Sequence, residues 1–192
     1  MLVISDEIHN DLICPGQEHT VYAALGEEYA RNCVIGTAAS KTFSLAGLCC
    51  ANLLIPDPEK KKALDQEIHR SGCYTHSIFG VRALEAGYTQ CGDWVDQLMD
   101  YIQGNYRCLT EFLARRIPEA WASPLEGTYL AWVNLNCLEP DPKVRAGLLE
   151  QAGLYLSHGS GFGDGAFERF NLACARSTLE QALDRLAALF PA

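Results

Sequence analysis

The first 36 residues contain two apolar runs separated by a stretch with helical spacing, and this pattern limits the folds open to the chain. Residues 1–5 form a mainly apolar run, which ends abruptly in the mainly polar residues 6–9. Apolar residues recur at helical intervals in 20–31, and 32–36 is again apolar. A strand, a helix and a second strand in so short a stretch predict a βαβ unit with parallel strands.

The remaining sequence continues this alternation of strands and helices, and the pattern changes near residue 90. Further strands are predicted at 48–55, 127–135 and 167–173. Further helices are predicted at 59–70, 77–87, 93–116 and 141–153, and a last one from a capping box at 177–180 to residue 189. We place a boundary near residue 90, between a parallel α/β part and a smaller α+β part.

The composition excludes some classes of partner. The chain has 192 residues and a formal net charge of −9, and its longest run of cations is the three lysines 60–62. Such a surface is unsuited to nucleic acid and to anionic membranes. No apolar run approaches the roughly 18 residues of a membrane span, and no signal peptide precedes the first strand. We therefore expect a soluble, cytoplasmic protein that binds neither nucleic acid nor membrane.

The nine cysteines are scattered, without a CxxC pair or a zinc-finger spacing. We interpret them as reduced, mostly buried thiols. A metal site built from His9, His19 and these cysteines lacks the spacing of ligands, so no metal is expected.

Two polar residues follow the two predicted parallel strands. Asp6 comes directly after the first strand, and Lys41 follows the second within a run of small and apolar residues, 36–48. Ligands of open parallel sheets bind beyond the carboxyl ends of the strands, so we expect both side chains to face one crevice. The neighbours of Lys41 are expected to enclose its stem and partly desolvate its amine, as a Schiff-base nucleophile requires. An exposed loop acid and an exposed loop lysine remain the alternative.

Four sequence blocks carry a resemblance to a known family. They are DEIH at 6–9, SKTFSLAGL at 40–48, GTYLAW at 127–132, and 159–177, which joins a glycine-rich run to ERFNLACARS. In this order they resemble the pyridoxal-phosphate-dependent enzymes of fold type I, within the class I/II aminotransferase family. The closest branch resembles the cystathionine β-lyases, or C–S lyases. The resemblance covers essentially the whole chain.

The resemblance implies an α/β fold in two parts. Residues 1–90 would be the C-terminal part of the large cofactor-binding domain, with a mainly parallel sheet, and residues 91–192 a small α+β C-terminal domain. Family members also have an N-terminal half with a glycine-rich phosphate loop, which has no counterpart here. We therefore expect a fragment with little activity by itself, and a homodimer for the full-length enzyme.

The resemblance assigns roles to residues near the predicted crevice. Lys41 would form the aldimine with pyridoxal 5'-phosphate and act as general base at the substrate α-carbon. Asp6 would pair with the pyridinium nitrogen and keep it protonated. Ser40 would contact the phosphate, and His9 would hydrogen-bond the phenolic oxygen or serve as a structural loop histidine. Cys49 stands where many aminotransferases have a phosphate-binding arginine, and this departure favours the lyase branch.

Further roles are implied in the second part of the chain. Arg169 would bind the substrate α-carboxylate through its bidentate fork, and the rival Arg176 is interpreted as a structural or surface residue. Tyr129 would border the substrate entrance, with a core aromatic residue as the alternative for it and for Trp132. The glycine-rich run 159–165 does not have the GxGxxG spacing. We interpret it as a loop that brings Arg169 into place.

The activity implied is that of a C–S β-lyase that cleaves amino-acid thioethers. A class I/II aminotransferase would use the same Lys41, Asp6 and Arg169, so these residues do not separate the two reactions. A third hypothesis is a catalytically inactive, truncated relative that serves as an interaction module.

Overall fold

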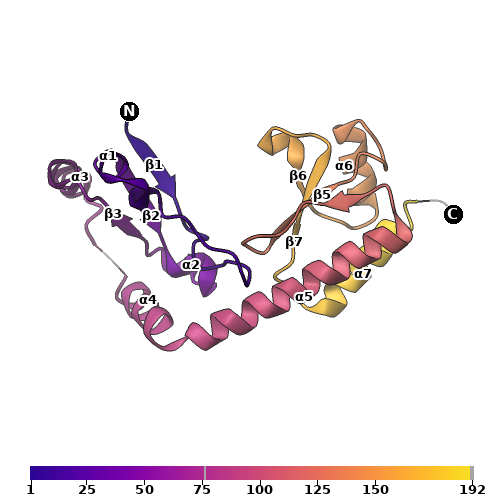
Figure 1. Ribbon diagram of the computed structural model, residues 1–192, viewed down its shortest axis with the longest axis horizontal. Coiled ribbons are helices and arrows are strands. Elements are labelled where there is room, and N and C mark those ends of the chain that lie inside the picture. Colours follow the sequence, from indigo (N-terminus) through magenta and orange to yellow (C-terminus); the bar gives the residue numbers. More distant parts are fainter. Residues whose placement is uncertain (76, 191–192) are drawn as a thin grey trace. The chain divides into compact units, whose positions relative to one another are not determined.

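The computed structural model describes residues 1–75 and 77–190 and divides the chain into two compact units, Met1–Leu98 and Met99–Ala192. Unit 1 contains a three-stranded sheet and unit 2 a four-stranded sheet, each with its own helices (Figure 1). No helix in the described part of the chain is both long and apolar enough to cross a membrane.

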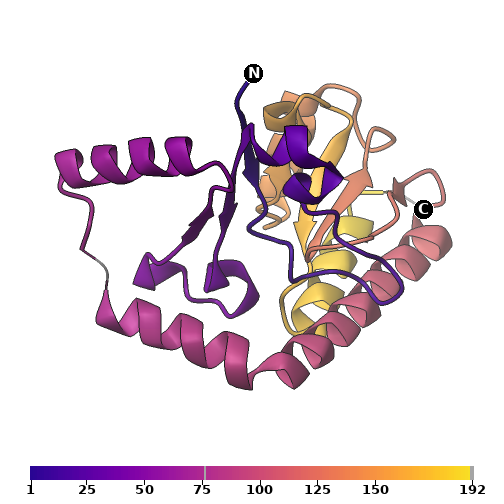
Figure 2. The same cartoon turned by 60° about the vertical axis from the view of Figure 1, so that its left-hand side comes forward.

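The sheet of unit 1 has the order β1-β2-β3 (Figure 2). Its strands are β1 (Val3–Asp6), β2 (Cys33–Thr37) and β3 (Asn52–Leu54). The pair β1 and β2 is parallel, as the apolar runs predict, whereas β3 is antiparallel to β2. The prediction of a mainly parallel sheet is therefore wrong for the described residues. The chain turns back through a short helix after β2, and this reverses the direction of β3.

The helix predicted at 20–31 is broken into two short pieces. A 3₁₀ turn covers Tyr22–Leu25, and α1 covers Glu27–Ala30. Gly26 lies between them with φ of 150°, a backbone conformation outside the helical range that glycine adopts without a steric penalty. The apolar spacing of this segment therefore does not become one continuous helix.

Among the other helices of unit 1, α3 (Pro58–Ser71) and α4 (Ile78–Gln90) follow the sequence signals. The sequence did not predict α2 (Ala39–Thr42) or a 3₁₀ turn (Ala46–Leu48). Asp57 caps α3 by accepting a hydrogen bond from the Lys60 amide, and Ser77 caps α4 by accepting one from the Gly80 amide. Both helices therefore begin close to their predicted starts.

Unit 2 is built on an antiparallel sheet in the order β4-β5-β7-β6. Its strands are β4 (Trp121–Ala122), β5 (Leu130–Asn134), β6 (Ser157–His158) and β7 (Phe167–Asn171). The helices are α5 (Gly92–Arg116), which begins in unit 1, α6 (Pro142–Gln151) and α7 (Arg176–Ala187). These helices cover one face of the sheet, and the side chains on that face are buried. The core includes Ile102, Leu109, Leu113, Ala131, Val133, Leu149, Phe170 and Leu183.

The start of α7 differs from the prediction. The helix already includes Arg176, its N-cap is Ala175, and no side chain caps it, so the capping box at 177–180 is wrong. The Arg176 amide donates a hydrogen bond to the Tyr101 hydroxyl at 2.8 Å, and its guanidinium donates one to Asn105 at 2.6 Å. These tertiary contacts hold the first turn in place of a local cap.

All nine cysteines are free thiols, but most of them are not buried. Only Cys14 and Cys33 are buried, and Cys49, Cys73 and Cys137 are exposed. The prediction of mostly buried thiols is therefore wrong, because these cysteines lie mainly in loops and at helix ends rather than on core-facing positions.

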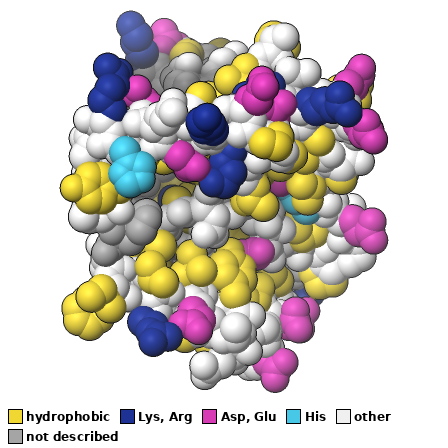
Figure 3. Space-filling view, turned by 90° about the vertical axis from the view of Figure 1, so that its left-hand side faces the viewer, with side chains coloured by type: hydrophobic (Ala, Val, Ile, Leu, Met, Phe, Trp, Pro, Cys, Tyr) yellow, Lys and Arg dark blue, Asp and Glu magenta, His cyan; other side chains and the backbone are white. Residues whose placement is uncertain are grey.

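Unit 1 leaves large apolar side chains in contact with solvent. Figure 3 shows a face of the molecule on which hydrophobic side chains gather. On the sheet, Ile4 is 77% exposed and Leu53 54% exposed. Isolated exposed apolar residues are common in proteins, but neighbouring ones on a sheet face indicate a surface suited to further contacts.

Candidate functional site

Asp6 lies at the carboxyl end of β1, on the solvent-facing side of the sheet. Side chains alternate along a strand, so Asp6 shares this side with Ile4. Its partner in register on β2 is Gly36, whose own partner on β3 is Leu53. A Cβ added to Gly36 would meet no atom closer than the Leu53 side chain at 3.9 Å. The glycine thus leaves open space over the sheet beside the Asp6 carboxylate.

A cavity of about 260 Å³ occupies this space. Asp6, Gly36, Thr37, Ala38 and Asn52 contribute to its lining. The Asp6 carboxylate is partly oriented by the Ile8 amide, which donates a hydrogen bond to it at 3.2 Å. The cavity therefore combines an exposed anion with small residues that allow a flat ligand to approach the backbone.

Lys41 and Ser40 lie on the short helix α2, which follows β2. Ala39 and Thr42 are the buried residues of this helix, and Lys41 is exposed between them. The expectation of an enclosed lysine stem is therefore wrong, because the helix turns its small residues toward the protein and its lysine toward solvent. Neither Lys41 nor Ser40 lines the cavity beside Asp6. The two parallel strands nonetheless place Asp6 and Lys41 after the same end of the sheet.

His9 lies half-buried in the turn that follows β1. The same turn contains Glu7, a buried carboxylate that sequence reasoning missed. Glu7 accepts hydrogen bonds from the Ser5 hydroxyl, the His19 ring and the Tyr22 amide, at 2.9 to 3.0 Å. The carboxylate therefore anchors the loop that joins β1 to the next element. In the sequence it looks like any other polar residue after a strand.

The anchoring of Glu7 predicts a pH dependence of stability. Burial alone would raise the pKa of Glu7, but the hydrogen bonds from His19, Tyr22 and Ser5 together hold the pKa below its usual value of 4.5. A carboxyl with a lowered folded-state pKa contributes stability above about pH 4.5 and loses that contribution as the pH falls through the folded-state pKa. Glu7→Gln is expected to destabilise unit 1 by about 2 kcal/mol at pH 7 and by less at pH 3.

Urea denaturation at both pH values measures this effect. The matched control is Glu27→Gln, which removes an exposed ion pair with Arg31, and a much smaller loss is expected for it at both pH values. An equal loss for Glu7→Gln at pH 7 and pH 3 would contradict the role of the ionised carboxylate.

Arg169 lies on β7, on the face of the unit 2 sheet that is not fully buried. Its guanidinium donates a hydrogen bond to the Ser157 hydroxyl at 3.2 Å and lies 4.5 Å from the centre of the Phe162 ring. Its partner in register on β5 is Trp132, whose ring stacks on Phe167 and contacts the edge of Phe162. The guanidinium is therefore held among aromatic rings, and part of it remains accessible.

The reverse face of β7 carries a buried ionic cluster that the sequence did not reveal. Glu168 is fully buried and accepts hydrogen bonds from Arg145 at 3.0 Å and from His158 at 2.8 Å. Arg145, also fully buried, donates to the carbonyl oxygens of Glu139 and Gly165 as well. Because Glu168 adjoins Arg169, this cluster fixes the strand that presents the arginine.

Tyr129 lies half-buried just before β5, and its carbonyl accepts a hydrogen bond from the Leu172 amide at 2.7 Å. Its backbone thus extends the pairing of β5 with the strand that holds Arg169. Tyr129 lies opposite Leu172, three residues beyond Arg169 along the chain, and both belong to unit 2, while Asp6, His9, Ser40 and Lys41 belong to unit 1.

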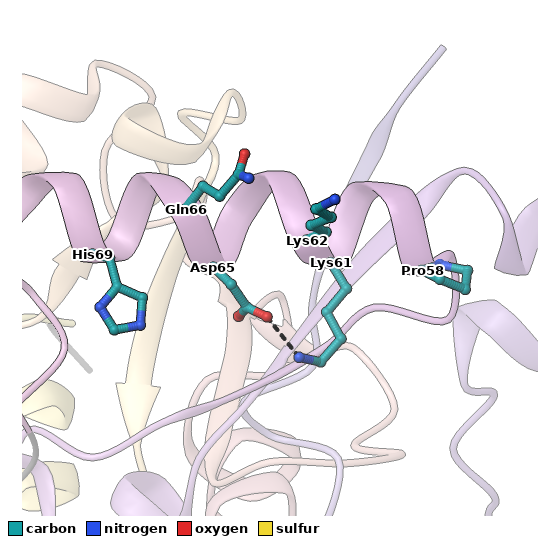
Figure 4. Close-up of a pocket in the computed structure, with 6 residues that line it drawn as sticks. All are labelled: Pro58, Lys61, Lys62, Asp65, Gln66 and His69. Carbon is teal, nitrogen blue, oxygen red and sulfur yellow. Dashed lines mark hydrogen bonds and ion pairs between the residues drawn. The ribbon is translucent and has the colours of Figure 1, made fainter.

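A larger hollow, of about 580 Å³, lies along α3 and contains none of the predicted site residues (Figure 4). A single helix supplies its lining, and Lys61 is paired there with Asp65 at 2.7 Å. Among residues 1–75 and 77–190, no three His, Cys, Asp or Glu side chains form a group that could hold a metal ion. The cavity beside Asp6 is therefore the better candidate for a ligand site.

Comparison with known proteins identifies the class to which this fold belongs. The sequence profile described as aminotransferase class I and II matches residues 1–186. The chain therefore belongs to the class I and II aminotransferase family, as the four sequence blocks indicate.

The relatives include cystathionine β-lyases as well as aminotransferases. Cystathionine beta-lyase PatB of Bacillus subtilis (strain 168) is 33% identical over 189 residues, which cover 97% of this chain and 49% of PatB. The crystal structure of cystalysin from Treponema denticola, which contains a pyridoxal 5'-phosphate cofactor, superposes with a TM-score of 0.93 at 35% identity. The match covers 98% of this chain and 49% of the cystalysin chain.

A third relative is the pyridoxal-phosphate-bound C–S lyase from Staphylococcus hominis. Its TM-score is 0.90 at 26% identity, with 100% of this chain matched to 49% of that one. The chain thus spans about half the length of the relatives that it matches. Its mixed α/β fold corresponds to half of a pyridoxal-phosphate enzyme.

Proposed function

We propose that this chain contributes the cofactor lysine, the ring-binding carboxylate and the substrate-binding arginine of a pyridoxal-phosphate-dependent C–S β-lyase. The observation that carries the proposal is the arrangement in unit 1. An exposed carboxylate and an exposed lysine follow two adjacent parallel strands, and a glycine leaves open space beside the carboxylate. The similarity to PatB and to the C–S lyase from Staphylococcus hominis supports the lyase reaction.

The residues of unit 1 suit a flat, anionic ligand that carries a ring cation. Asp6 offers a carboxylate that would hold the proton of a ring nitrogen in a charge-assisted hydrogen bond. A Cβ at Gly36 would project into the cavity where such a ring would lie. Ser40 supplies a hydroxyl for a phosphate group, and His9 a ring nitrogen for a phenolic oxygen. Pyridoxal 5'-phosphate, when bound, supplies a conjugated ring that accepts the electron pair left when the α-proton is removed.

Lys41 would carry out the proton transfers at the substrate. Its amine is exposed, and no ion pair with it is found within the described residues. An amine in this position removes the α-proton and returns it to the sulfur that leaves the β-carbon. With one water consumed, an amino-acid thioether then yields a thiol, pyruvate and ammonia.

Arg169 would bind the carboxylate of the amino acid. Its guanidinium presents a planar fork of donors, which suits a carboxylate better than a lysine ammonium does. Ser157 and Phe162 hold this fork, so little side-chain entropy remains to be lost on binding. Tyr129, just before the neighbouring strand β5, would form part of the wall around the substrate.

Chemical labelling tests the assignment of Lys41. The chain has five lysines, 41, 60, 61, 62 and 143, and pyridoxal phosphate followed by borohydride marks each one that reacts. Condensation of an amine with the aldehyde releases one water, and hydride from borohydride with a proton from water leaves a stable secondary amine. Lys41 is expected to be labelled about tenfold faster than Lys143, because Asp6 and Ser40 retain the reagent nearby.

Peptide mass spectrometry measures the ratio of labelled Lys41 to labelled Lys143. Asp6→Ala is expected to reduce this ratio while labelling of Lys143 stays constant. Equal labelling of the two lysines in the natural protein would rule out the proposed cofactor site.

An aminotransferase is the alternative that the family itself allows. The two reactions are separated by their products when residues 1–192 are co-expressed with the half of PatB that they do not match. A lyase releases pyruvate and ammonia from cystathionine without an added keto acid. An aminotransferase consumes a keto acid and forms the corresponding amino acid in equal amount.

A further inference from the structure

We propose that Asp11 is a positioning residue that fixes the Lys41 helix relative to Asp6, acting through Thr42. This inference rests on the proposed function of Lys41. Asp11 lies in the polar turn after β1, and its carboxylate contacts the residue that follows Lys41 in the sequence. The proposed function does not otherwise use this carboxylate.

The contact between Asp11 and Thr42 is short and protected. The Thr42 hydroxyl donates a hydrogen bond to the Asp11 Oδ2 atom at 2.7 Å, and Thr42 is only 1% exposed. A buried hydroxyl that loses its acceptor incurs a desolvation cost, so this bond holds α2 in one position. Because Lys41 and Thr42 are consecutive in a helix of four residues, fixing Thr42 also fixes the backbone of Lys41.

The same carboxylate oxygen accepts a second hydrogen bond, from α4. The Tyr88 hydroxyl, on α4, donates a second hydrogen bond to Asp11 Oδ2 at 2.9 Å. Burial, together with the hydrogen bond and the charge of Asp11, raises the pKa of Tyr88 to about 12. The hydroxyl therefore stays protonated and remains a donor throughout the physiological pH range.

The neighbouring aromatic residue reinforces this position. Phe43 packs edge-on against Tyr88, with ring centres 5.7 Å apart, and also contacts Trp94. A Cβ at Gly87 would lie only 2.7 Å from the Phe43 ring, so the ring rests directly on the backbone of α4. Thr42 is thus held against the turn after β1, and Phe43 against α4.

Two cross-links therefore join the segment with Asp6 to the segment with Lys41. The first is the strand pairing, in which Asp6 is in register with Gly36 and the Glu7 amide donates to the Gly36 carbonyl at 2.9 Å. The second is the bond from Thr42 to Asp11. Strand pairing ends at Thr37, and the Phe43 ring ties the following helix to α4 rather than to the turn after β1. The bond from Thr42 to Asp11 ties α2 to the turn that follows Asp6, and it thereby limits the separation of carboxylate and amine.

Amide hydrogen exchange of the protein without cofactor tests directly whether the bond between Thr42 and Asp11 holds α2 in place. In Asp11→Ala, the amides of residues 39–45 are expected to exchange about tenfold faster, because α2 loses its anchor. The amides of β1 and β2 should remain unchanged. Asp11→Asn retains an oxygen that accepts from both hydroxyls, so its exchange should stay within about threefold of the natural protein.

A double-mutant cycle separates the local effect of the bond between Thr42 and Asp11 from a general destabilisation of the protein. Thr42→Val should also speed exchange of residues 39–45, and the double variant should be no worse than Asp11→Ala, because the bond from Thr42 is already lost in Asp11→Ala. The matched control is Thr89→Val on α4, whose hydroxyl bonds only the backbone of its own helix in the described structure. It should leave residues 39–45 unaffected.

Labelling with pyridoxal phosphate and borohydride tests whether the same substitutions change the reactivity of Lys41. The ratio of labelled Lys41 to labelled Lys143 is expected to fall about fivefold to tenfold in Asp11→Ala and Thr42→Val, and to be restored in Asp11→Asn. If exchange of residues 39–45 in Asp11→Ala stays within about twofold of the natural protein, the inference is overturned. If Lys41 and Lys143 of the natural protein are labelled equally, the proposed function is contradicted. The exchange measurement still tests whether Asp11 holds α2.

Discussion

Arg145→Met is expected to destabilise unit 2 by about 3–5 kcal/mol, the cost of breaking a buried ion pair by removing one partner. The substitution leaves the fully buried Glu168 carboxylate with His158 as its remaining side-chain partner. It also removes the donors to the carbonyl oxygens of Glu139 and Gly165. Denaturation by guanidinium chloride, followed by circular dichroism and tryptophan fluorescence, measures the loss.

The matched control for Arg145 is Arg185→Met on α7. Arg185 is exposed, and it donates a hydrogen bond to the Gly153 carbonyl at 3.3 Å, so a loss of about 0.5 kcal/mol is expected. Replacing the pair together, as Arg145→Met with Glu168→Leu, should recover part of the stability, because no unpaired buried charge remains. If Arg145→Met costs no more than Arg185→Met, the cluster does not hold β7.

Gly159→Ala is the second change with a large expected effect. A Cβ at this buried glycine would overlap the carbonyl oxygens of Asp164 and Phe167, and both are backbone atoms that cannot rotate away. We expect a loss of about 3 kcal/mol in the stability of unit 2, because the glycine-rich loop or β7 must shift. The loop also carries Phe162, so the ring is expected to leave the Arg169 guanidinium.

Gly161→Ala, two residues further along the same loop, is the control. No atom lies within 4 Å of a Cβ at this position, so a change of less than about 0.5 kcal/mol is expected. Thermal unfolding gives the stabilities, and NMR signals of the Arg169 guanidinium report whether the Phe162 ring remains against it. Equal behaviour of the two alanine variants would show that the loop adapts without cost.

Several features of the fold follow from local sequence patterns. The apolar runs at the start of the chain predict β1 and β2 and their parallel pairing, and the helical spacing predicts α3, α4 and α5. These patterns are local consequences of side-chain periodicity and capping, so they need no knowledge of distant residues. The placement of Asp6 and Lys41 after the ends of the two strands follows from the same patterns.

Other features depend on contacts between segments far apart in the sequence. Arg145, Glu168 and His158 each look like ordinary surface residues until strand pairing and α6 bring them together. Asp11 and Thr42 are likewise separated by 31 residues. No periodicity links such residues, because their contact results from the register of strands and the packing of helices.

The sequence by itself determined the family of this chain and the two parallel strands that end at Asp6 and before Lys41. These depend on residue identity and on short-range spacing. Only the tertiary structure decided that Lys41 is exposed, that β3 runs antiparallel, that Asp11 accepts a hydrogen bond from Thr42, and that Arg145 and Glu168 form a buried pair. Burial and direction depend on which surfaces meet, and a side chain acquires its partner only when distant segments pack together.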